Sequence, residues 1–423
     1  MSIAAIPKYL GDDFTSASPG MRFGMYLRLW NPNNTWTREK TSAFDHVKTL
    51  TDGDQQIMKN LLKRQISSFD GFQPAIASLR LAAQATAPFT TGLGNAHPLE
   101  NGFAFLNPYG LPYLPGSGIK GVLRQAAREL ASGDWGDTHG WSAADVYPLF
   151  ITGKSGQREQ VKDTNKQPVM LSLLDLLFGR ESKDGETTHL RGALSFWDVI
   201  PQIPGKELMV EVMTPHQGQY YQGKTNPHDS GQPTPIQFLT LPPKSIFTFH
   251  VVCDTAHLMQ HAPELAAYEA WQTLLIKAFE HAFDWLGFGA KTAIGYGAMQ
   301  RDKSQEAKLQ QAGLAIAKQR EEEKRLANLS PEELDRDRER QIIEAFRQKF
   351  ETANKSSYQP GGNFDNDRQK FIQEALQWND AHSRHAAAAL IEKTMTKSWG
   401  MPGKAERKKK IQDAIQALQG NLV

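Results

Sequence analysis

The chain has 423 residues, of which 39% are hydrophobic, so it is long enough to form two or three domains with a sizeable core. Its net charge of +2 allows a nucleic-acid partner without requiring one. The single cysteine, Cys253, excludes a disulfide framework and a multi-cysteine zinc site, and the lack of a long apolar run or signal-peptide pattern predicts a soluble, cytoplasmic protein with no membrane partner.

Residues 1–75 are interpreted as a helical and loop segment that packs on the domain after it. Apolar residues recur at helical spacing from about Asp54 to Ile66, which predicts one helix. Alternation from Ser78 to Thr90 predicts the first strand of a domain that covers residues 76–301. A loop rich in glycine, asparagine and proline follows from Thr91 to Pro115.

The next helix is expected to start at Ser117 and to end near Leu130. Serine is a preferred N-cap residue, and good helix formers follow it with few breakers. Residues 132–170 are rich in glycine and aspartate and are interpreted as a long insertion. Leu171 to Phe178 is expected to form a short apolar helix that ends at Gly179.

The rest of this domain contains strand-like segments around a second, polar insertion at residues 214–235. Strands are expected at Leu190–Val199, Glu207–Met213, Phe238–Leu241 and Ser245–Val252, with a helix at Leu265–Leu286 and a β-like stretch at Ala293–Met299. The order β, α, β, β, α, β predicts an α+β fold whose sheet is ferredoxin-like (RRM-like, split βαβ) and carries helices on one face. The open face of such a sheet commonly meets RNA.

The composition changes abruptly after Arg301. Residues 301–350 contain 12 Lys/Arg and 11 Asp/Glu, a much higher share of charge than the 22% of the whole chain. Ser330 followed by proline and two glutamates is typical of a helix start. We therefore expect residues 302–423 to form a separate, charged α-helical extension.

The stretch from Gly287 to Gly297 is the most informative part of the sequence. It holds four glycines together with Lys291, Thr292 and Tyr296. Glycines let the backbone approach a partner closely, and a cation with a flat ring suits a ribose-phosphate strand whose bases can stack. Its context, helix then loop then strand, is the reverse of a nucleotide-binding P-loop. The pattern therefore predicts a polymer-binding loop.

A second glycine pattern, PGSGIKG from Pro115 to Gly121, contains a literal GxGxxG motif. The proline-bounded segment before it is a poor central strand, so a dinucleotide site is not expected. A helix N-terminus with Lys120 and Arg124 one turn apart suits a phosphate backbone instead. The alternative, that these glycines only let helix and strand pack closely, stays open.

These two loops, together with LRGALSFWD from Leu190 to Asp198, resemble the RAMP superfamily of CRISPR effector proteins. Three further segments, Gly92–His97, Pro112–Gly116, and Thr214–Tyr221 with Pro235–Leu239, resemble the sixth subunit of the type III-B Cmr complex. The resemblance covers roughly residues 20–300, and the tail after about residue 302 departs from the usual family length.

The resemblance implies an RNA-binding subunit that caps a filament of other RAMP subunits of the Cmr complex. It would bind guide (CRISPR) RNA near its 3′ end and help to bind target RNA in antiviral defence. The guide-contacting candidates are Gly116, Ser117, Gly118, Lys120, Arg124, Gly289, Lys291, Thr292 and Tyr296. Tyr220, Tyr221 and Lys224 lie in a thumb-type insertion. Arg191 is expected to brace the sheet, and Phe196 and Trp197 to lie in the core.

No catalytic residue is predicted. In relatives that cut target RNA, an aspartate between the first strand and first helix is implicated, and this chain has no aspartate between Asp70 and Asp134. Glu100, His97 and His216 are the residues on which an alternative, active endoribonuclease would depend. A protein-only scaffold is the other alternative.

No cofactor and no metal are predicted either. His216, His228 and Asp229 are close in sequence, but their spacing fits no zinc pattern.

Overall fold

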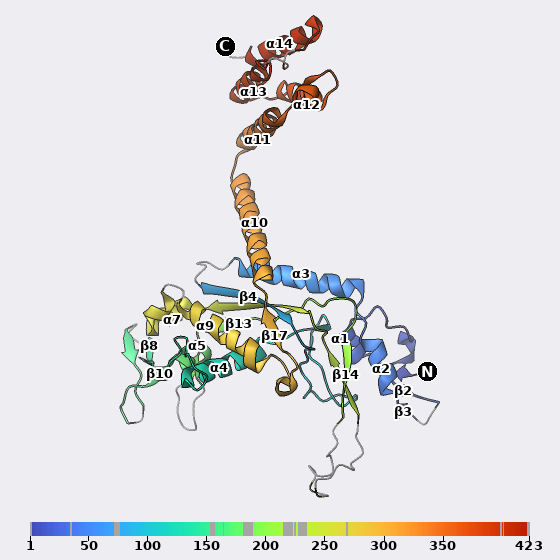
Figure 1. Ribbon diagram of the computed structural model, residues 1–423, viewed down its shortest axis with the longest axis vertical. Helices are drawn as coiled ribbons and strands as arrows, with labels where there is room; N and C mark the ends of the chain where they lie inside the picture. Colours follow the sequence, from blue (N-terminus) through green and yellow to red (C-terminus); the bar gives the residue numbers. More distant parts are fainter. Residues whose placement is uncertain are drawn as a thin grey trace. The chain divides into compact units, whose positions relative to one another are not determined.

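The computed structural model describes residues 2–33, 36–71, 77–152, 157–163, 165–180, 189–214, 223, 226, 235–267, 270–397, 400 and 402–420. The chain divides into two compact units, Met1–Ile316 (unit 1) and Ala317–Val423 (unit 2) (Figure 1). Within the described ranges no helix is long and apolar enough to cross a membrane.

Unit 1 is built on a four-stranded sheet in the order β13 (Leu194–Phe196), β16 (Ile246–Cys253), β4 (Ser78–Ala85) and β17 (Met299–Arg301). All neighbouring pairs are antiparallel. The two long strands, β4 and β16, lie side by side at the centre. Helix α4 lies between β4 and β13 in the chain, and α9 lies between β16 and β17.

Helices α4 (Gly116–Ser132) and α9 (Ala270–His281) contact each other and cover one face of the sheet (Figure 1). The buried residues of α4 recur at helical spacing, so this helix presents a single apolar stripe to the core. From the sheet, Phe249 packs against Phe279 of α9 with ring centroids 5.2 Å apart. The main core of the unit lies between these two layers.

The opposite face of the sheet is closed as well, which contradicts the expected open RNA-binding face. It is covered by α3 (Asp52–Phe69) and by the first turns of α10 (Lys303–Ala327), which together bury Ala82 of β4 between Ile66 and Leu309. Helix α3 begins at a capping box and is somewhat longer than predicted. A helix from before the first strand and a helix from after the last strand thus occupy the surface that RNA would need.

The end of α3 is fixed to this face by an aromatic and ionic cluster. Phe69 makes edge contacts with Trp197 and with His250, whose ring is 1% exposed. Asp70 accepts a hydrogen bond from Arg80 of β4 at 2.8 Å. Burial lowers the pKa of His250 to about 3, so this ring is neutral and behaves as core. Trp197 contacts Phe69 but is only half-buried and lies in no core cluster of the described residues, so the prediction that it lies in the core is not confirmed.

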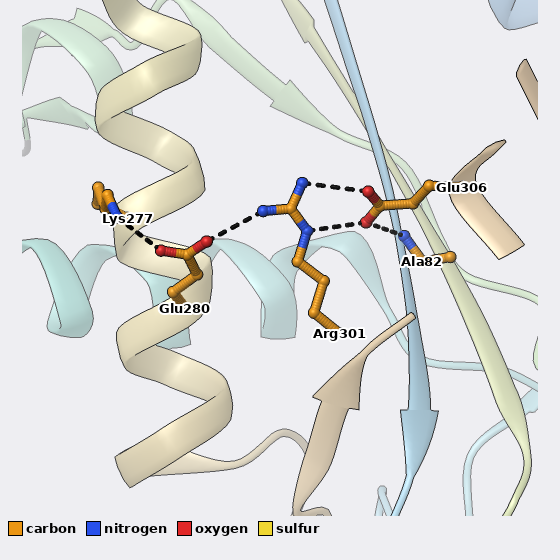
Figure 2. A network of polar contacts seen from close by, with 5 residues as sticks. All are labelled: Ala82, Lys277, Glu280, Arg301 and Glu306. Atoms are coloured by element: carbon orange, nitrogen blue, oxygen red, sulfur yellow. Dashed lines mark hydrogen bonds and ion pairs between the residues drawn. The ribbon is translucent and has the colours of Figure 1, made fainter. Parts of the chain in front are cut away.

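Arg301 at the end of β17 joins four elements of unit 1 (Figure 2). Its guanidinium donates two hydrogen bonds to Glu306 of α10, at 3.0 and 3.1 Å, and one to Glu280 of α9 at 3.0 Å. Glu306 also accepts from the backbone N–H of Ala82 at 3.1 Å, and Glu280 accepts from Lys277 at 2.9 Å. The bidentate pair ties the start of α10 to the edge strand β17, and the bond from Ala82 ties it to the central strand β4.

Short helices and two-stranded ladders fill the rest of unit 1. The helices are α1 (Pro19–Phe23), α2 (Lys40–Val47), α5 (Leu173–Phe178), α7 (Thr255–His261) and α8 (Pro263–Ala266). The three-stranded sheet near the N-terminus comprises β1 (Ile3–Ala4), β2 (Arg28–Asn31) and β3 (Thr37–Arg38). The ladders pair β5 (Phe105–Leu106) with β6 (Leu111–Pro112), β7 (Val146–Pro148) with β10 (Met170–Ser172), β8 (Phe150–Thr152) with β9 (Arg158–Gln160), β11 (Gly179–Arg180) with β12 (Leu190–Arg191), and β14 (Met209–Met213) with β15 (Ile236–Thr240).

Unit 2 is helical and has its own core. Its helices are α11 (Pro331–Thr352), α12 (Asn363–Ala375), α13 (Ala381–Thr394) and α14 (Ala405–Gln419). Phe346 of α11 stacks on Phe371 of α12 with ring centroids 4.1 Å apart. The predicted helix start at Ser330 is confirmed, because its side chain accepts from the N–H of Glu333 and the Glu333 carboxylate accepts in return.

Three sequence-based predictions of local structure are wrong for tertiary reasons. The predicted strand over Leu190–Val199 is broken between β12 and β13, because Gly192 lies against the backbone of Phe178, where a Cβ would be 2.4 Å from a carbonyl carbon. The predicted helix over Leu265–Leu286 is interrupted at Ala267, whose backbone is extended, and ends in a π-turn from Ala282.

The predicted β-like stretch Ala293–Met299 is largely a turn. Thr292–Ile294 forms a 3-10 turn, and strand β17 begins only at Met299. Gly295 and Gly297 have φ angles of 96° and 71°, which a strand does not contain.

The Arg301 network predicts the effect of Glu306→Ala. The substitution removes both hydrogen bonds to Arg301 and the acceptor for the Ala82 N–H in a partly buried site, so we expect the free energy of unfolding of unit 1 to fall by about 2–4 kcal/mol. Urea unfolding of the full chain measures it. Glu321→Ala, at an exposed position of the same helix, is the control and should change the value by less than about 0.5 kcal/mol. Equal small effects would mean that the network does not hold α10.

Candidate nucleic-acid interface

A basic cleft of about 390 Å³ lies where the start of α4 meets the β11–β12 ladder and β13. Its lining includes Ser117, Lys120 and Arg124 from α4, together with Arg180 and Arg191 from the ladder. The described residues that line it include no acidic side chain. The structure therefore brings one of the two predicted glycine motifs together with the Leu190–Asp198 motif in a single site.

The start of α4 is fixed by backbone contact with β13. A Cβ on Gly116 would lie 2.2 Å from the carbonyl oxygen of Phe196, so only glycine fits there. The N–H of Gly116 donates to the Asp198 carboxylate at 2.7 Å. The predicted N-cap, Ser117, is wrong. The helix follows Pro115 with no side-chain cap from its own flank, and the Asp198 carboxylate, two residues after β13, accepts the hydrogen bond instead. Part of the helix N-terminal charge is thus already neutralised, and the cleft's cations must come from side chains.

The cations of the cleft differ in how firmly they are held. Arg124 lies 3.9 Å from the Asp175 carboxylate, and its Nε is buried without a hydrogen-bond partner. Lys120 forms no ion pair with any described residue, and it lies one turn before Arg124 on the same side of the helix. Arg191 is exposed on β12 and lines the cleft, so the expectation that it braces the sheet is wrong. These groups can bind a phosphate or another multivalent anion.

The residues of the second glycine loop do not line this cleft. Lys291 has a left-handed backbone, and its Nζ donates to the sulfur of Met213 at 2.8 Å and lies 5.3 Å from the centre of the Phe238 ring. The Tyr296 hydroxyl donates to Glu211 at 3.4 Å. Burial, with the nearby Glu211 carboxylate, raises the pKa of Tyr296. Both side chains therefore hold the loop against the β14–β15 ladder.

Two glycines of this loop are required by packing. A Cβ on Gly289 would lie 2.3 Å from the carbonyl oxygen of Thr90, and a Cβ on Gly297 would lie 1.8 Å from that of Phe288. Gly295, in contrast, has open space around it. The glycine pattern predicts that the backbone comes close to a partner. At positions 289 and 297 it does so, but the partner is another part of the same chain. Thr292 is half-buried, and a Cβ on Gly287 would meet its methyl group at 3.2 Å.

Other predicted site residues fall elsewhere. Gly118 lies in the first turn of α4 and packs near Leu114, outside the lining of the cleft. Tyr220, Tyr221 and Lys224 lie outside the described residues. The same holds for the group His216, His228 and Asp229. In the described part of the chain no group of three or more His, Cys, Asp or Glu side chains could hold a metal ion.

The two described candidates for nuclease chemistry are occupied by structural contacts. His97 Nδ1 accepts from the N–H of Leu99 at 3.1 Å, so Nε2 carries the proton and donates to the carbonyl oxygen of Phe23 at 2.9 Å. Burial lowers the pKa of His97 despite that second bond. Glu100 forms an ion pair with Lys40. Both ring nitrogens of His97 are thus engaged inside the protein, whereas Glu100 is paired through one carboxylate oxygen and is exposed.

Sequence reasoning missed Arg180 as a member of the cleft and Asp198 as the cap of α4. Arg180 directly follows the predicted short helix and the glycine that ends it. This pattern predicts a turn, but it does not predict which part of the protein the turn lies against. Asp198 is the last residue of the recognised LRGALSFWD motif, and its partner lies 82 residues earlier in the chain. The antiparallel bridge between Leu114 and Val199, close to each of them in the chain, brings the two together.

Comparison with known proteins gives consistent results. A family model described as the RAMP superfamily matches residues 83–300. The CRISPR system Cmr subunit Cmr6 of Pyrococcus furiosus is 30% identical over 235 residues, which cover 49% of this chain and 63% of that protein, so the match spans less than two thirds of the relative's length.

Solved structures with a detectable likeness include three from CRISPR systems. The crystal structure of Cmr6 from Pyrococcus furiosus is 27% identical and covers 53% of this chain and 98% of its own, with a TM-score of 0.26. A chain of the type III-B Cmr-beta complex bound to cognate target RNA is 17% identical, covering 62% and 71%, with a TM-score of 0.37. A chain of a type IV-B CRISPR complex is 16% identical, covering 53% and 89%, with a TM-score of 0.31.

The packing of the glycine loop predicts different effects for two glycine-to-alanine substitutions. Both positions have φ above 90°, so an alanine at either one introduces backbone strain of about 1–2 kcal/mol. Only Gly289→Ala also creates a clash with backbone atoms, which costs about 1–3 kcal/mol more. We expect Gly289→Ala to lower the free energy of unfolding more than Gly295→Ala in the same urea titration. If the two substitutions lowered the free energy of unfolding equally, the close packing of Gly289 against the backbone would not contribute to stability.

Proposed function

This chain belongs to the RAMP superfamily, and on that premise we propose that it is an RNA-binding subunit of a type III-B CRISPR ribonucleoprotein. The observation that carries the proposal is the basic cleft at the start of α4, which lies within the residues that match the family. The similarity to Cmr6 supports the type of complex. The partners proposed are guide RNA, target RNA and other RAMP subunits.

The chemistry of the cleft suits a sugar-phosphate backbone. Lys120 offers a mobile ammonium, and Arg191 offers a planar guanidinium that can bind a phosphate through two hydrogen bonds. The side chains make these contacts without reading bases, so binding should be independent of RNA sequence. That property fits a guide-binding subunit, since the guide differs from one complex to the next while its backbone does not.

We interpret the sheet of unit 1 as ferredoxin-like, as the strand order and the alternation of strands and helices support. Because α3 and α10 cover the face that RNA-recognition sheets use, we propose that RNA contacts this subunit at the helix start and the β11–β12 ladder. We further propose that the subunit caps a filament of related subunits, near the 3′ end of the guide, and contributes to antiviral defence by helping to bind target RNA.

We propose a non-catalytic role in target cleavage. The internal hydrogen bonds of His97 support this, because a general base needs a free lone pair close to the reacting hydroxyl. Glu100 is held to Lys40 through one carboxylate oxygen. If either residue were catalytic, Glu100→Gln or His97→Ala in the assembled complex would abolish one cut site while leaving RNA binding intact. The same test applies to His216→Ala.

The phosphate-binding role of the cleft predicts the behaviour of Lys120→Ala. Loss of one phosphate contact should weaken binding of the full chain to single-stranded RNA similarly for unrelated sequences, and should reduce the slope of log affinity against log salt by about 0.7–1. Fluorescence anisotropy at several salt concentrations measures both quantities. Lys63→Ala, an exposed lysine of α3, is the matched control and should leave the slope unchanged.

Three outcomes of this titration would contradict the proposal. No binding by the wild-type chain would favour a protein-only scaffold. An unchanged slope for Lys120→Ala would remove this residue from the phosphate contacts. An equal effect of Lys63→Ala would mean that RNA is attracted by overall charge and not by the cleft.

A further inference from the structure

Unit 2 contains a groove of about 710 Å³ that the RNA-binding proposal does not involve. It is lined by α11, by the end of α12 and by the turn that leads into α13. Carboxylates outnumber cations along it: Glu332, Asp335, Glu339, Glu374 and Asp380 face only Arg336 and Arg338 among the described lining residues. This excess of negative charge excludes RNA as the occupant and favours a cation.

Among the residues that the structure describes, only one of these carboxylates has a side-chain or capping partner. Asp380 caps α13 by accepting from the N–H of Ser383 at 2.8 Å, and it also accepts from Arg336 at 3.0 Å. The hydrogen bond from the Ser383 N–H is the main cause that lowers the pKa of Asp380, and the nearby Arg336 adds to it. The other four acidic residues of the lining form no ion pair with any described residue. The negative charge of the groove is therefore largely uncompensated.

Glu339 differs from the exposed carboxylates of the groove because its side chain is buried. It is 6% exposed, and its Oε2 is buried with no hydrogen-bond partner among the described residues. A buried carboxylate without a partner opposes folding, and a glutamine or an apolar residue at this position would not carry that cost in full. A cation that enters the groove and reaches this oxygen would supply the missing partner.

The shape and lining of the groove identify the kind of cation. No cluster of three potential metal ligands exists in the described part of the chain, so a bound metal ion is not favoured. Buried Trp378 and half-buried Ile342 form apolar parts of the lining, which suit the aliphatic stem and flat head of an arginine. Glu332, Asp335 and Glu339 follow each other at spacings of three and four residues, a row on one side of α11 about 10 Å long.

We propose that this groove binds a lysine- and arginine-bearing segment of a partner protein, with one cationic side chain paired to Glu339. A row of carboxylates of that length matches several cations carried on one chain, and the uncompensated charge gives the complementarity that orients such a partner. The proposal is independent of RNA binding, because it involves unit 2 alone. It gives the helical tail a function in assembly.

Binding of a short, fluorescein-labelled helical peptide with arginines at three- and four-residue spacing to the full chain tests the proposal. Glu339→Gln keeps the size of the side chain and removes its charge, and we expect it to raise the Kd at least about tenfold. Glu392→Gln removes one charge from an exposed position of α13 outside the groove and should change the Kd less than about twofold. The Tm of Glu339→Gln without peptide should equal or exceed that of the wild type.

A second variant and a second ligand keep the test decisive. If Glu339→Gln lowers the Tm, the exposed double substitution Glu332→Gln with Asp335→Asn must still weaken peptide binding more than Glu392→Gln does. Equal peptide affinity of all variants would overturn the proposal. Spermine binding as tightly as the peptide would show a site for free polyamines instead of a protein segment. The salt slope of RNA binding should be the same in Glu339→Gln and wild type.

Discussion

The cleft in unit 1 depends on one close backbone approach, that of the first residue of α4 to strand β13. Gly116 lies so near the carbonyl oxygen of Phe196 that no other residue fits, and its N–H is taken by Asp198. The register of the helix against the strand is thereby fixed, and with it the positions of Lys120 and Arg124 one and two turns further on. These cations are aimed by the backbone. Arg124 lies within ion-pair distance of Asp175, whereas Lys120 forms no ion pair with any described residue and so stays available to an anion.

The closure of both sheet faces changes how the fold can meet a nucleic acid. In an open four-stranded sheet the bases would stack on side chains of the central strands. Here those positions are core: Ala82 is buried beneath Leu309, and the His250 ring lies against Phe69. The ion pairs from Arg301 to Glu306 hold α10 at this face. Under the proposed function, RNA would meet the edge of the sheet, where the start of α4 and the β11–β12 ladder expose cations, and such a surface favours phosphate contacts over base contacts.

Local features of the fold could be predicted from sequence, and long-range ones could not. Helical spacing and caps predict α3, the body of α4 and the start of α11, because these signals lie within a few residues of each other. The cap at Gly116 could not be predicted, since its carboxylate comes from Asp198, 82 residues further along the chain. The glycine loop shows a second limit. Glycines needed for packing, such as Gly289, and glycines with open surroundings, such as Gly295, look the same in sequence, and they differ only in what a Cβ would meet.

Composition conceals the electrostatics in a similar way. A net charge of +2 over 423 residues suggests no strong preference for any partner. Fields are screened over about 10 Å at moderate salt, so each surface acts on a ligand through its own charges and not through the total. The cleft in unit 1 gathers cations with no acid among its described lining residues, whereas the groove in unit 2 gathers carboxylates, one of them buried and unpaired. A polyanion that suits the first is repelled by the second. If both proposals hold, RNA binds in unit 1 and a basic protein segment in unit 2, and neither ligand competes for the other's site.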